Sequence, residues 1–265
     1  MFLSLFDMFK IGVGPSSSHT MGPMVAAGRF LVLLRASPFH PRGVKASLHG
    51  SLAFTGIGHA TDRAVILGLA GFLPETYDAA KADAALASIR ETHRLVNPGL
   101  PDLVFDPAHD LHFDYGPPLK GHANGMVLKA TDEQGDVIAE ETYFSIGGGF
   151  VVTAAEQAGG KAGTGGPAIP YPFESADEML AMAKTSGISI AAMKRANELV
   201  HRNRAALDDG IARVWGVMND CINRGLAGDG ILPGGLKVRR RAGHIHKALL
   251  AERGMNQQEI GRAHV

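Results

Sequence analysis

The sequence predicts an α+β N-terminal domain followed by the start of an all-helical domain. Apolar and polar residues alternate over Val44–Phe54, which is the pattern of a half-buried strand. Two further strands, Gly125–Thr131 and Val137–Ile146, flank the turn sequence DEQG and predict a hairpin. Between Met193 and Ile222 the apolar residues instead recur at helical spacing. Strands mixed with helices and a hairpin are typical of α+β domains.

The first domain is expected to begin with a short apolar element, Ser4–Ile11, and a loop over residues 12–20. Pro23 suits the first turn of the helix that follows, whose apolar residues are Met24, Ala27, Leu31 and Leu34. Two more helices are expected over Arg63–Ala70 and Asp78–Val96, the second with one face formed by Leu86, Ile89, His93 and Val96. The segment 97–118 has no periodicity and predicts no regular element.

A change in composition marks the boundary between the domains. The segment 158–172, AGGKAGTGGPAIPYP, reads as a Gly/Pro linker. Ser175 and Glu178 beyond it predict a capping box for a helix through Lys184. The apolar stripe that follows is expected to break at residues 208–210, Asp-Asp-Gly. The predicted domains are therefore residues 1–157 and 173–258.

Composition narrows the class of protein. At about 150 residues per domain, 265 residues favour two domains. With 26 basic and 26 acidic residues, a role of the whole chain on nucleic acid or a membrane surface is excluded. No signal peptide and no apolar run of membrane-spanning length is present, so we expect a cytoplasmic protein. One cysteine excludes a disulfide framework and any metal cluster held only by thiolates of this chain.

The strongest local signal is a loop of polar donors directly ahead of the first long helix. After Gly14-Pro15 come Ser16, Ser17, Ser18, His19 and Thr20. A helix N-terminus adds unpaired N–H groups and a positive dipole, so the loop could hold a carboxylate or a phosphate. The alternative is that the Ser and Thr residues are ordinary helix caps. No Lys stands where a P-loop requires one.

A second loop, Gly58-His59-Ala60-Thr61-Asp62, also lies at a helix start after an apolar strand. The imidazole of His59 titrates near neutral pH, which makes it our candidate general base; the alternative is a structural histidine. A third candidate segment of the site is His122-Ala123-Asn124-Gly125-Met126. The alternative is that this segment is a simple turn. The glycines 147–149 end a strand where backbone can approach a ligand or another domain, or merely form a flexible exit.

Two other features favour structural explanations. Cys221 lies beside the apolar stripe of the second domain, so we expect a buried core residue. The basic run 239–241 is interpreted as a solvated face or a contact to acidic residues rather than a nucleic-acid site.

Six segments occur in an order that identifies a family: GPSSSHTMGPM, HGSLAFTGIGHATD, HANGM, TYFSIGGGF, YPFESADEML and CINRGLAGDGILPGGLKVRRRA. Together they resemble the iron–sulfur-dependent L-serine dehydratases of the single-chain bacterial type, from Ser4 to about Leu250. The resemblance implies conversion of L-serine to pyruvate and ammonia without pyridoxal phosphate. It also implies an α+β domain followed by a helical catalytic domain with a 4Fe–4S cluster.

The resemblance also implies roles for individual residues. An iron of the cluster with an open position would act as Lewis acid on the serine hydroxyl, while a base removes the Cα proton. We expect His59 to be that base. The substrate carboxylate would bind to Ser16, Ser17, Ser18, His19 and Thr20, and the same pocket would be lined by His122 and Asn124. We expect the full-length protein to be a homo-oligomer.

One departure from the family matters for activity. The family holds its cluster with three cysteines beyond the region matched here, and Cys221 is not one of them. The chain therefore resembles the first half of such an enzyme and is expected to be inactive alone. Residues 259–265, EIGRAHV, can be back-translated into a string that looks like a sequencing adapter, so we expect a non-native tail that clean genomic sequence would test.

Parts of the sequence are also similar to proteins of two other functions. The first domain is similar to serine-binding allosteric domains of some phosphoglycerate dehydrogenases, which would make this chain a non-catalytic serine-binding protein. Gly-rich Ser loops also cradle phosphates in small-molecule kinases of the GHMP type, but the order of the other motifs does not fit that family.

Overall fold

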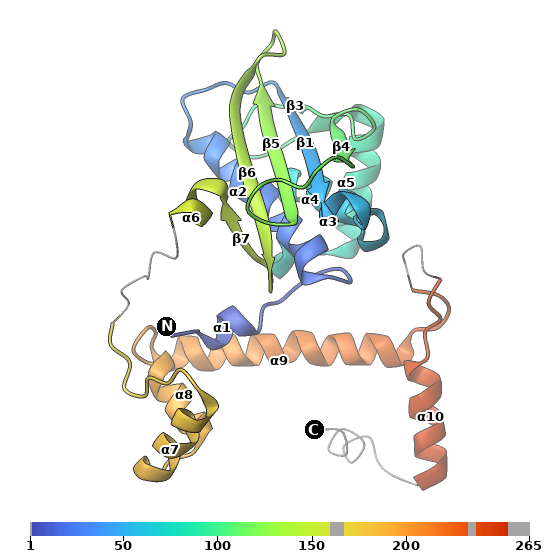
Figure 1. Cartoon of the computed structure of the whole chain (residues 1–265). Helices are drawn as coiled ribbons and strands as arrows, with labels where there is room; N and C mark the ends of the chain where they lie inside the picture. Colours follow the sequence, from blue (N-terminus) through green and yellow to red (C-terminus); the bar gives the residue numbers. More distant parts are fainter. Residues whose placement is uncertain (1, 160–166, 233–236, 254–265) are drawn as a thin grey trace. The chain divides into compact units, whose positions relative to one another are not determined.

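The computed structural model describes residues 2–159, 167–232 and 237–253 (Figure 1). It consists of a half-barrel sheet with helices, followed by a helical stretch, so the predicted fold class is confirmed. Its contacts form two compact units. The α+β unit is Lys10–Gly166, and the helical unit combines Met1–Phe9 with Pro167–Val265.

The α+β unit carries a seven-stranded sheet and the helices that cover it. Its helices are η1 Ser17–Met21, α2 Gly22–Ala36, α3 Ser51–Phe54, η2 Ile57–His59, α4 Thr61–Leu69, η3 Pro74–Thr76, α5 Ala79–Thr92 and α6 Ala154–Ala158. Its strands are β1 Gly43–Gly50, β2 Arg94–Leu95, β3 Leu103–Val104, β4 Leu111–Asp114, β5 Asn124–Thr131, β6 Val137–Gly147 and β7 Phe150–Thr153.

Strand β1 is the centre of the sheet, whose order is β2-β3-β1-β5-β6-β7. Along one edge β1 pairs antiparallel with β5 over its whole length, from Gly43↔Thr131 to Gly50↔Asn124. Its other edge pairs parallel with β3 and then with β4. The predicted hairpin is confirmed as β5–β6, while β3, β4 and β7 were missed because strands of two to four residues show no periodicity.

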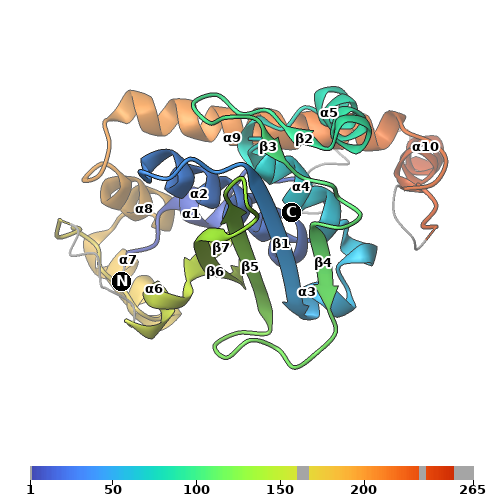
Figure 2. The ribbon, with the colours of Figure 1, turned by 90° about the horizontal axis from the view of Figure 1, so that it is seen from above.

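The core lies between one face of the sheet and the helices α2, α4 and α5, which Figure 2 shows along the same side of β1, β5 and β6. All four apolar residues expected on the buried face of α2 are buried: Met24, Ala27, Leu31 and Leu34. In α5 only part of the expected face is buried. The helix ends at His93, which has φ +54°, so that Val96 is 70% exposed beyond it.

The first predicted strand was wrong at its C-terminal end. The structure ends β1 at Gly50 and turns residues 51–54 into α3, although the alternation continues to Phe54. Gly50 has φ +56°, and a Cβ there would lie 2.4 Å from the carbonyl oxygen of Ala123. A side chain is therefore excluded, and the backbone leaves the extended region at this point.

The helical unit contains α1 Leu5–Met8, α7 Ala176–Ser186, α8 Ile190–Glu198, α9 Arg204–Ala227 and α10 Ala242–Arg253. The predicted break at residues 208–210 was wrong, because α9 runs through them as one continuous helix (Figure 1). The interruption falls before Asn203, which caps α9. Gly210 is explained by packing instead, since a Cβ there would lie 2.4 Å from the ring of Phe6.

Two smaller expectations for the helical unit also need correction. Ser175 caps α7 as predicted, but the Glu178 carboxylate accepts from the N–H of Glu174 rather than of Ser175, so the box is half formed. Cys221 is exposed rather than buried, because the whole α9 face around it is exposed.

The ends of the predicted domains are described only in part. Residues 1–9, placed by sequence in the first domain, group with the helical unit because the Ser4 hydroxyl donates to Glu198 and Lys194 donates to the Leu3 carbonyl, both at 3.0 Å. The limits 1–157 and 173–258 stay a prediction. Part of the linker 158–172 and the whole tail 259–265 lie outside the described residues.

Among the described helices, none is both long and apolar enough to cross a bilayer.

Candidate functional site

The serine-rich loop forms the start of the first long helix, as the sequence indicates. Residues 17–21 make a single π-helical turn, η1, that continues directly into α2. Ser16 caps this turn, because its hydroxyl accepts from the N–H of His19 at 3.1 Å. Ser17 is exposed and Ser18 half-buried, so both remain accessible. Single π-helical turns of this kind occur frequently at functional sites.

The ring of His19 is held at both of its nitrogens. Nδ1 lies 2.9 Å from the Ser18 hydroxyl, and Nε2 lies 2.9 Å from the hydroxyl of Ser51, at the start of α3. A neutral imidazole donates from one nitrogen and accepts at the other. His19 therefore joins two serines in one hydrogen-bonded row and leaves neither ring nitrogen unpartnered.

The loops that carry His19 and His59 are tied together by two reciprocal hydrogen bonds. The Thr20 hydroxyl donates to the backbone carbonyl of His59 at 2.9 Å, and the Thr61 hydroxyl donates to the backbone carbonyl of His19 at 2.6 Å. Both threonines are buried, at 5% and 0% exposed. This exchange brings the two imidazole rings to a centroid separation of 4.8 Å.

The hydrogen bond of His59 defines its tautomer. Its Nδ1 lies 2.9 Å from the backbone carbonyl of Thr55, and because a carbonyl only accepts, Nδ1 carries the proton. In the neutral ring Nε2 is then the unprotonated nitrogen. This unprotonated nitrogen has the lone pair that a general base needs. His59 is half-buried, so it is not enclosed by the fold.

The surroundings of His19 shift its pKa. Burial lowers this pKa below its ordinary value, and the nearby His59 ring lowers it further, while a backbone hydrogen bond to Ser51 acts in the opposite direction. A charge on one ring disfavours a charge on its neighbour. His19 is thus biased toward the neutral form.

The loop 122–126 reaches the same end of β1 through the sheet. Gly50 pairs with Asn124 across β1 and β5, and the N–H of Ser51 donates to the carbonyl of Ala123 at 2.8 Å. The side chains of this loop mainly shape it, since His122 Nδ1 accepts from the N–H of Asn124 and the Asn124 amide donates to the Ser145 carbonyl. The third predicted signal therefore lies next to the first two.

The glycines 147–149 form the tight turn between β6 and β7, and all three have positive φ. A Cβ on Gly149 would lie 3.0 Å from the Met21 side chain, so the turn packs closely against η1. Just before it, Ser145 is 2% exposed, and a Cβ on Gly22 would lie 1.9 Å from its hydroxyl. Gly22 and Gly149 therefore serve close packing, whereas Gly147 and Gly148 serve the positive φ of the turn.

Sequence reasoning missed three residues that build this site. Ser51 was assigned to a strand, and Thr55 and Thr61 had no assigned role. The one available signal was Gly50-Ser51 at the end of an apolar strand, since a glycine there permits a sharp turn. The hydroxyl contacts themselves depend on how distant loops meet.

The cluster implied by the family does not fit the residues of this chain. Its single cysteine, Cys221, is exposed on α9. Within the described residues no group of three His, Cys, Asp or Glu side chains could hold a metal ion. A 4Fe–4S cluster requires thiolate ligands that this chain does not supply.

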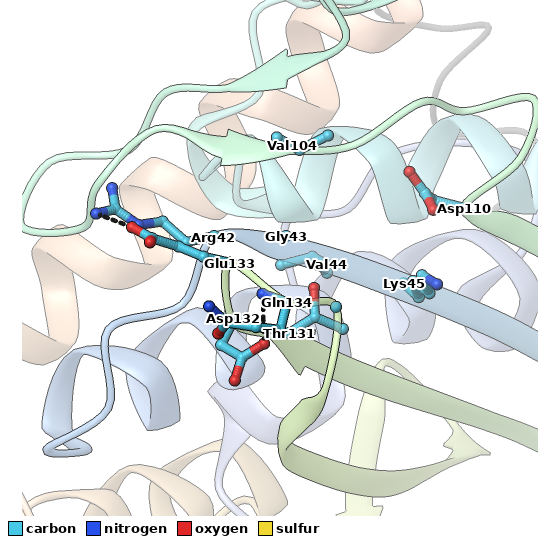
Figure 3. Close-up of a pocket in the computed structure, with 11 residues that line it drawn as sticks. Arg42, Gly43, Val44, Lys45, Val104, Asp110, Thr131, Asp132, Glu133 and Gln134 are labelled. Atoms are coloured by element: carbon cyan, nitrogen blue, oxygen red, sulfur yellow. Dashed lines mark hydrogen bonds and ion pairs between the residues drawn. The ribbon is translucent and has the colours of Figure 1, made fainter.

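A cavity of about 310 Å³ lies at the opposite end of β1 and contains none of the predicted site residues (Figure 3). It lies beside the β5–β6 turn, where Arg42 forms an ion pair with Glu133 at 2.8 Å. Figure 3 shows this pair at one edge and Lys45 with Asp110 at the other. The turn itself is organised by Asp132, whose carboxylate accepts from two backbone N–H groups.

Comparison with known proteins identifies the family. Residues 4–156 match the family model described as "Serine dehydratase beta chain". The L-serine dehydratase of Streptomyces coelicolor is 41% identical over 254 residues, which is 95% of this chain and 56% of the relative. That of Haemophilus influenzae is 37% identical over 97% of this chain and 57% of its own length. Escherichia coli L-serine dehydratase 1 is 38% identical over 94% and 55%. The chain thus spans about half the length of these curated relatives, and it belongs to the serine dehydratase beta chain family.

Proposed function

We propose that this chain forms the serine-binding part of an L-serine dehydratase and contributes the base of the reaction. The observation that carries the proposal is the meeting of the serine-rich loop with His59, whose Nε2 is the unprotonated ring nitrogen. The names of the relatives supply the substrate, L-serine. The geometry supports a site with hydroxyl and N–H donors on one side and a proton acceptor on the other.

In this proposal the substrate carboxylate binds at the N-terminus of η1. Ser17 offers an exposed hydroxyl there, next to the positive end of the helix dipole, and Ser18 a half-buried one that also bonds Nδ1 of His19. Ser16 and Thr20 already use their hydroxyls within the fold, so they shape the loop around the ligand. His122 and Asn124 border the pocket from the neighbouring strand end.

The proposed chemistry begins at His59 Nε2, which accepts the Cα proton of serine. The electron pair left on Cα forms the Cα–Cβ double bond as the Cβ–O bond breaks, and the departing hydroxide takes up the proton held by His59 and leaves as water. The resulting aminoacrylate tautomerises and is hydrolysed to pyruvate and ammonia. A 4Fe–4S cluster would polarise the departing hydroxyl, but it needs thiolate ligands that the single cysteine of this chain does not supply, so we expect the 265-residue chain alone to have no turnover.

Calorimetry with L-serine tests the binding step directly. We expect the chain to bind L-serine, and Ser17→Ala together with Ser18→Ala to weaken binding at least tenfold, since charge-assisted hydrogen bonds to the carboxylate are lost. L-alanine is the matched ligand that keeps the carboxylate and removes the hydroxyl. A chain that binds neither amino acid would refute the proposal.

A second candidate is a serine-binding protein without turnover. It is favoured by the mismatch between a single exposed cysteine and a cluster that needs three. Pyruvate formation by an anaerobically reconstituted sample would exclude this candidate, and would also refute the expected inactivity. Serine binding without pyruvate formation would favour it for this chain.

A further inference from the structure

Ser51 connects all three loops that the site combines. Its hydroxyl bonds Nε2 of His19 in the serine-rich loop, and its N–H donates to the carbonyl of Ala123 in the loop 122–126. Its own carbonyl accepts from both the N–H and the hydroxyl of Thr55, the residue whose carbonyl receives the proton of His59 Nδ1. These contacts use three different atoms of one serine, the hydroxyl oxygen, the amide nitrogen and the carbonyl oxygen.

We propose that Ser51 is a positioning residue of the site, which fixes the His19 ring against His59 and aligns both with the loop 122–126. An effect of Ser51 on catalysis rests on the proposed function. The positions that Ser51 gives to the His19 ring and the neighbouring loops do not depend on the substrate. Nothing in the sequence pattern assigned a role to this residue.

His19 is restrained both at its backbone and at the two nitrogens of its ring. The Thr61 hydroxyl fixes its backbone carbonyl, Ser18 fixes Nδ1 and Ser51 fixes Nε2. Of the two contacts to the ring, the one from Ser18 comes from the adjacent residue and moves with the same loop. The bond to Ser51 is thus the ring contact that relates His19 to the rest of the unit.

The place of Ser51 is itself set by the backbone. Gly50 turns the chain out of β1 with φ +56°, in direct contact with Ala123. The hydroxyl of Ser51 is therefore delivered by the end of a central strand, which is a rigid support. The titratable group facing the His19 ring is His59, at 4.8 Å.

Titration of the histidine rings by NMR tests the proposal on the full chain. In Ser51→Ala we expect the titration curve of His19 to change, because its Nε2 loses the hydrogen bond to the Ser51 hydroxyl. The ¹⁵N shifts of its ring should change toward mixed tautomers, and the His59 resonances should move because the neighbouring His19 ring has turned.

Ser47→Ala is the matched control, because the Ser47 hydroxyl lies 2.9 Å from Nε2 of a different histidine, His49. His49 faces Asp114 and His112, so its titration is separate from that of the site. We expect Ser47→Ala to move His49 and leave His19 and His59 unchanged. Equal effects of both variants on all three rings would overturn the proposal.

A second pair of variants keeps the test decisive if Ser51→Ala does not fold. Ser51→Thr retains the hydroxyl and should preserve the His19 shifts, whereas Ser51→Val has the same shape without it and should change them. Unchanged His19 and His59 signals in Ser51→Val would refute the positioning role. Failure of serine to bind the wild-type chain would instead count against the proposed function, so the two failures are distinguishable.

Discussion

The two units of this chain differ in how far their apolar side chains are buried. In the α+β unit the large apolar residues of α2, β1, α4 and β5 are buried in one continuous core. Among the described residues of the helical unit, the buried apolar side chains are Met193 and Leu207. On α9, Trp215, Met218 and Ile222 are 60%, 46% and 51% exposed. The first unit has a continuous apolar core although single apolar residues such as Ile57 stay exposed, whereas the described part of the second presents an apolar stripe on α9 that favours contact with another surface.

This difference also separates the candidate site from the rest of the molecule. The site is built entirely on the α+β unit, where strand register and buried threonines fix the positions of its loops. Rigid support is what a binding or catalytic constellation requires. From their packing, we expect the two units to differ in stability and in association.

The largest expected effect is in the core of the α+β unit. Phe30 is fully buried on α2, so Phe30→Ala should cost about 3–5 kcal/mol of unfolding free energy. Ile222→Ala, on the exposed stripe of α9, should change it by about 0.5 kcal/mol or less. Urea denaturation of both variants measures this. Similar losses in the two would mean that the α9 stripe is buried in solution.

The next effect concerns the turn that delivers Ser51. Gly50→Ala introduces a Cβ at φ +56°, 2.4 Å from the Ala123 carbonyl, and should destabilise the chain by about 1–3 kcal/mol. Gly58→Ala is the control, because no atom lies within 4 Å of its Cβ position. A neutral Gly50→Ala in thermal denaturation would show that the end of β1 is not rigidly held.

The exposed stripe predicts self-association and poor solubility of the wild-type chain. Replacing Met218 and Ile222 together by Lys should shift the chain toward a monodisperse species, since charge on the stripe opposes apolar contact. Light scattering coupled to size-exclusion chromatography measures the mass. A wild-type chain that is already monodisperse and unfolds cooperatively would contradict the comparison between the units.

The smallest expected effect is a dependence of stability on pH from His19. Because its pKa is lower in the folded state than its ordinary value of 6.5, the unfolded chain binds the proton more readily. The stabilising contribution is therefore present above about pH 6.5 and is lost as the pH falls through the folded pKa. Denaturation at pH 7.5 and 5.5 should show a larger loss for the wild type than for His19→Gln. An equal loss in both would exclude His19 as the source.

Local patterns were sufficient for the elements whose own residues decide their structure. The spacing of Met24, Ala27, Leu31 and Leu34 predicted the buried face of α2, and alternation predicted the β5–β6 hairpin. The break in the second half was misplaced because Gly210 looks like a helix breaker, whereas it accommodates the ring of Phe6, a contact that no local pattern contains.

The same distinction applies to the site. The sequence by itself indicated which loops are candidates for the site, because donors before a helix and a histidine after a strand are local features. Only the tertiary structure decided that these loops meet: the register of β1 against β5 puts Asn124 beside Gly50, and Thr20 and Thr61 join the two histidine loops across about 40 residues. Contacts between residues so far apart depend on strand pairing and packing of the whole unit, and Ser51 acquires its role only through them.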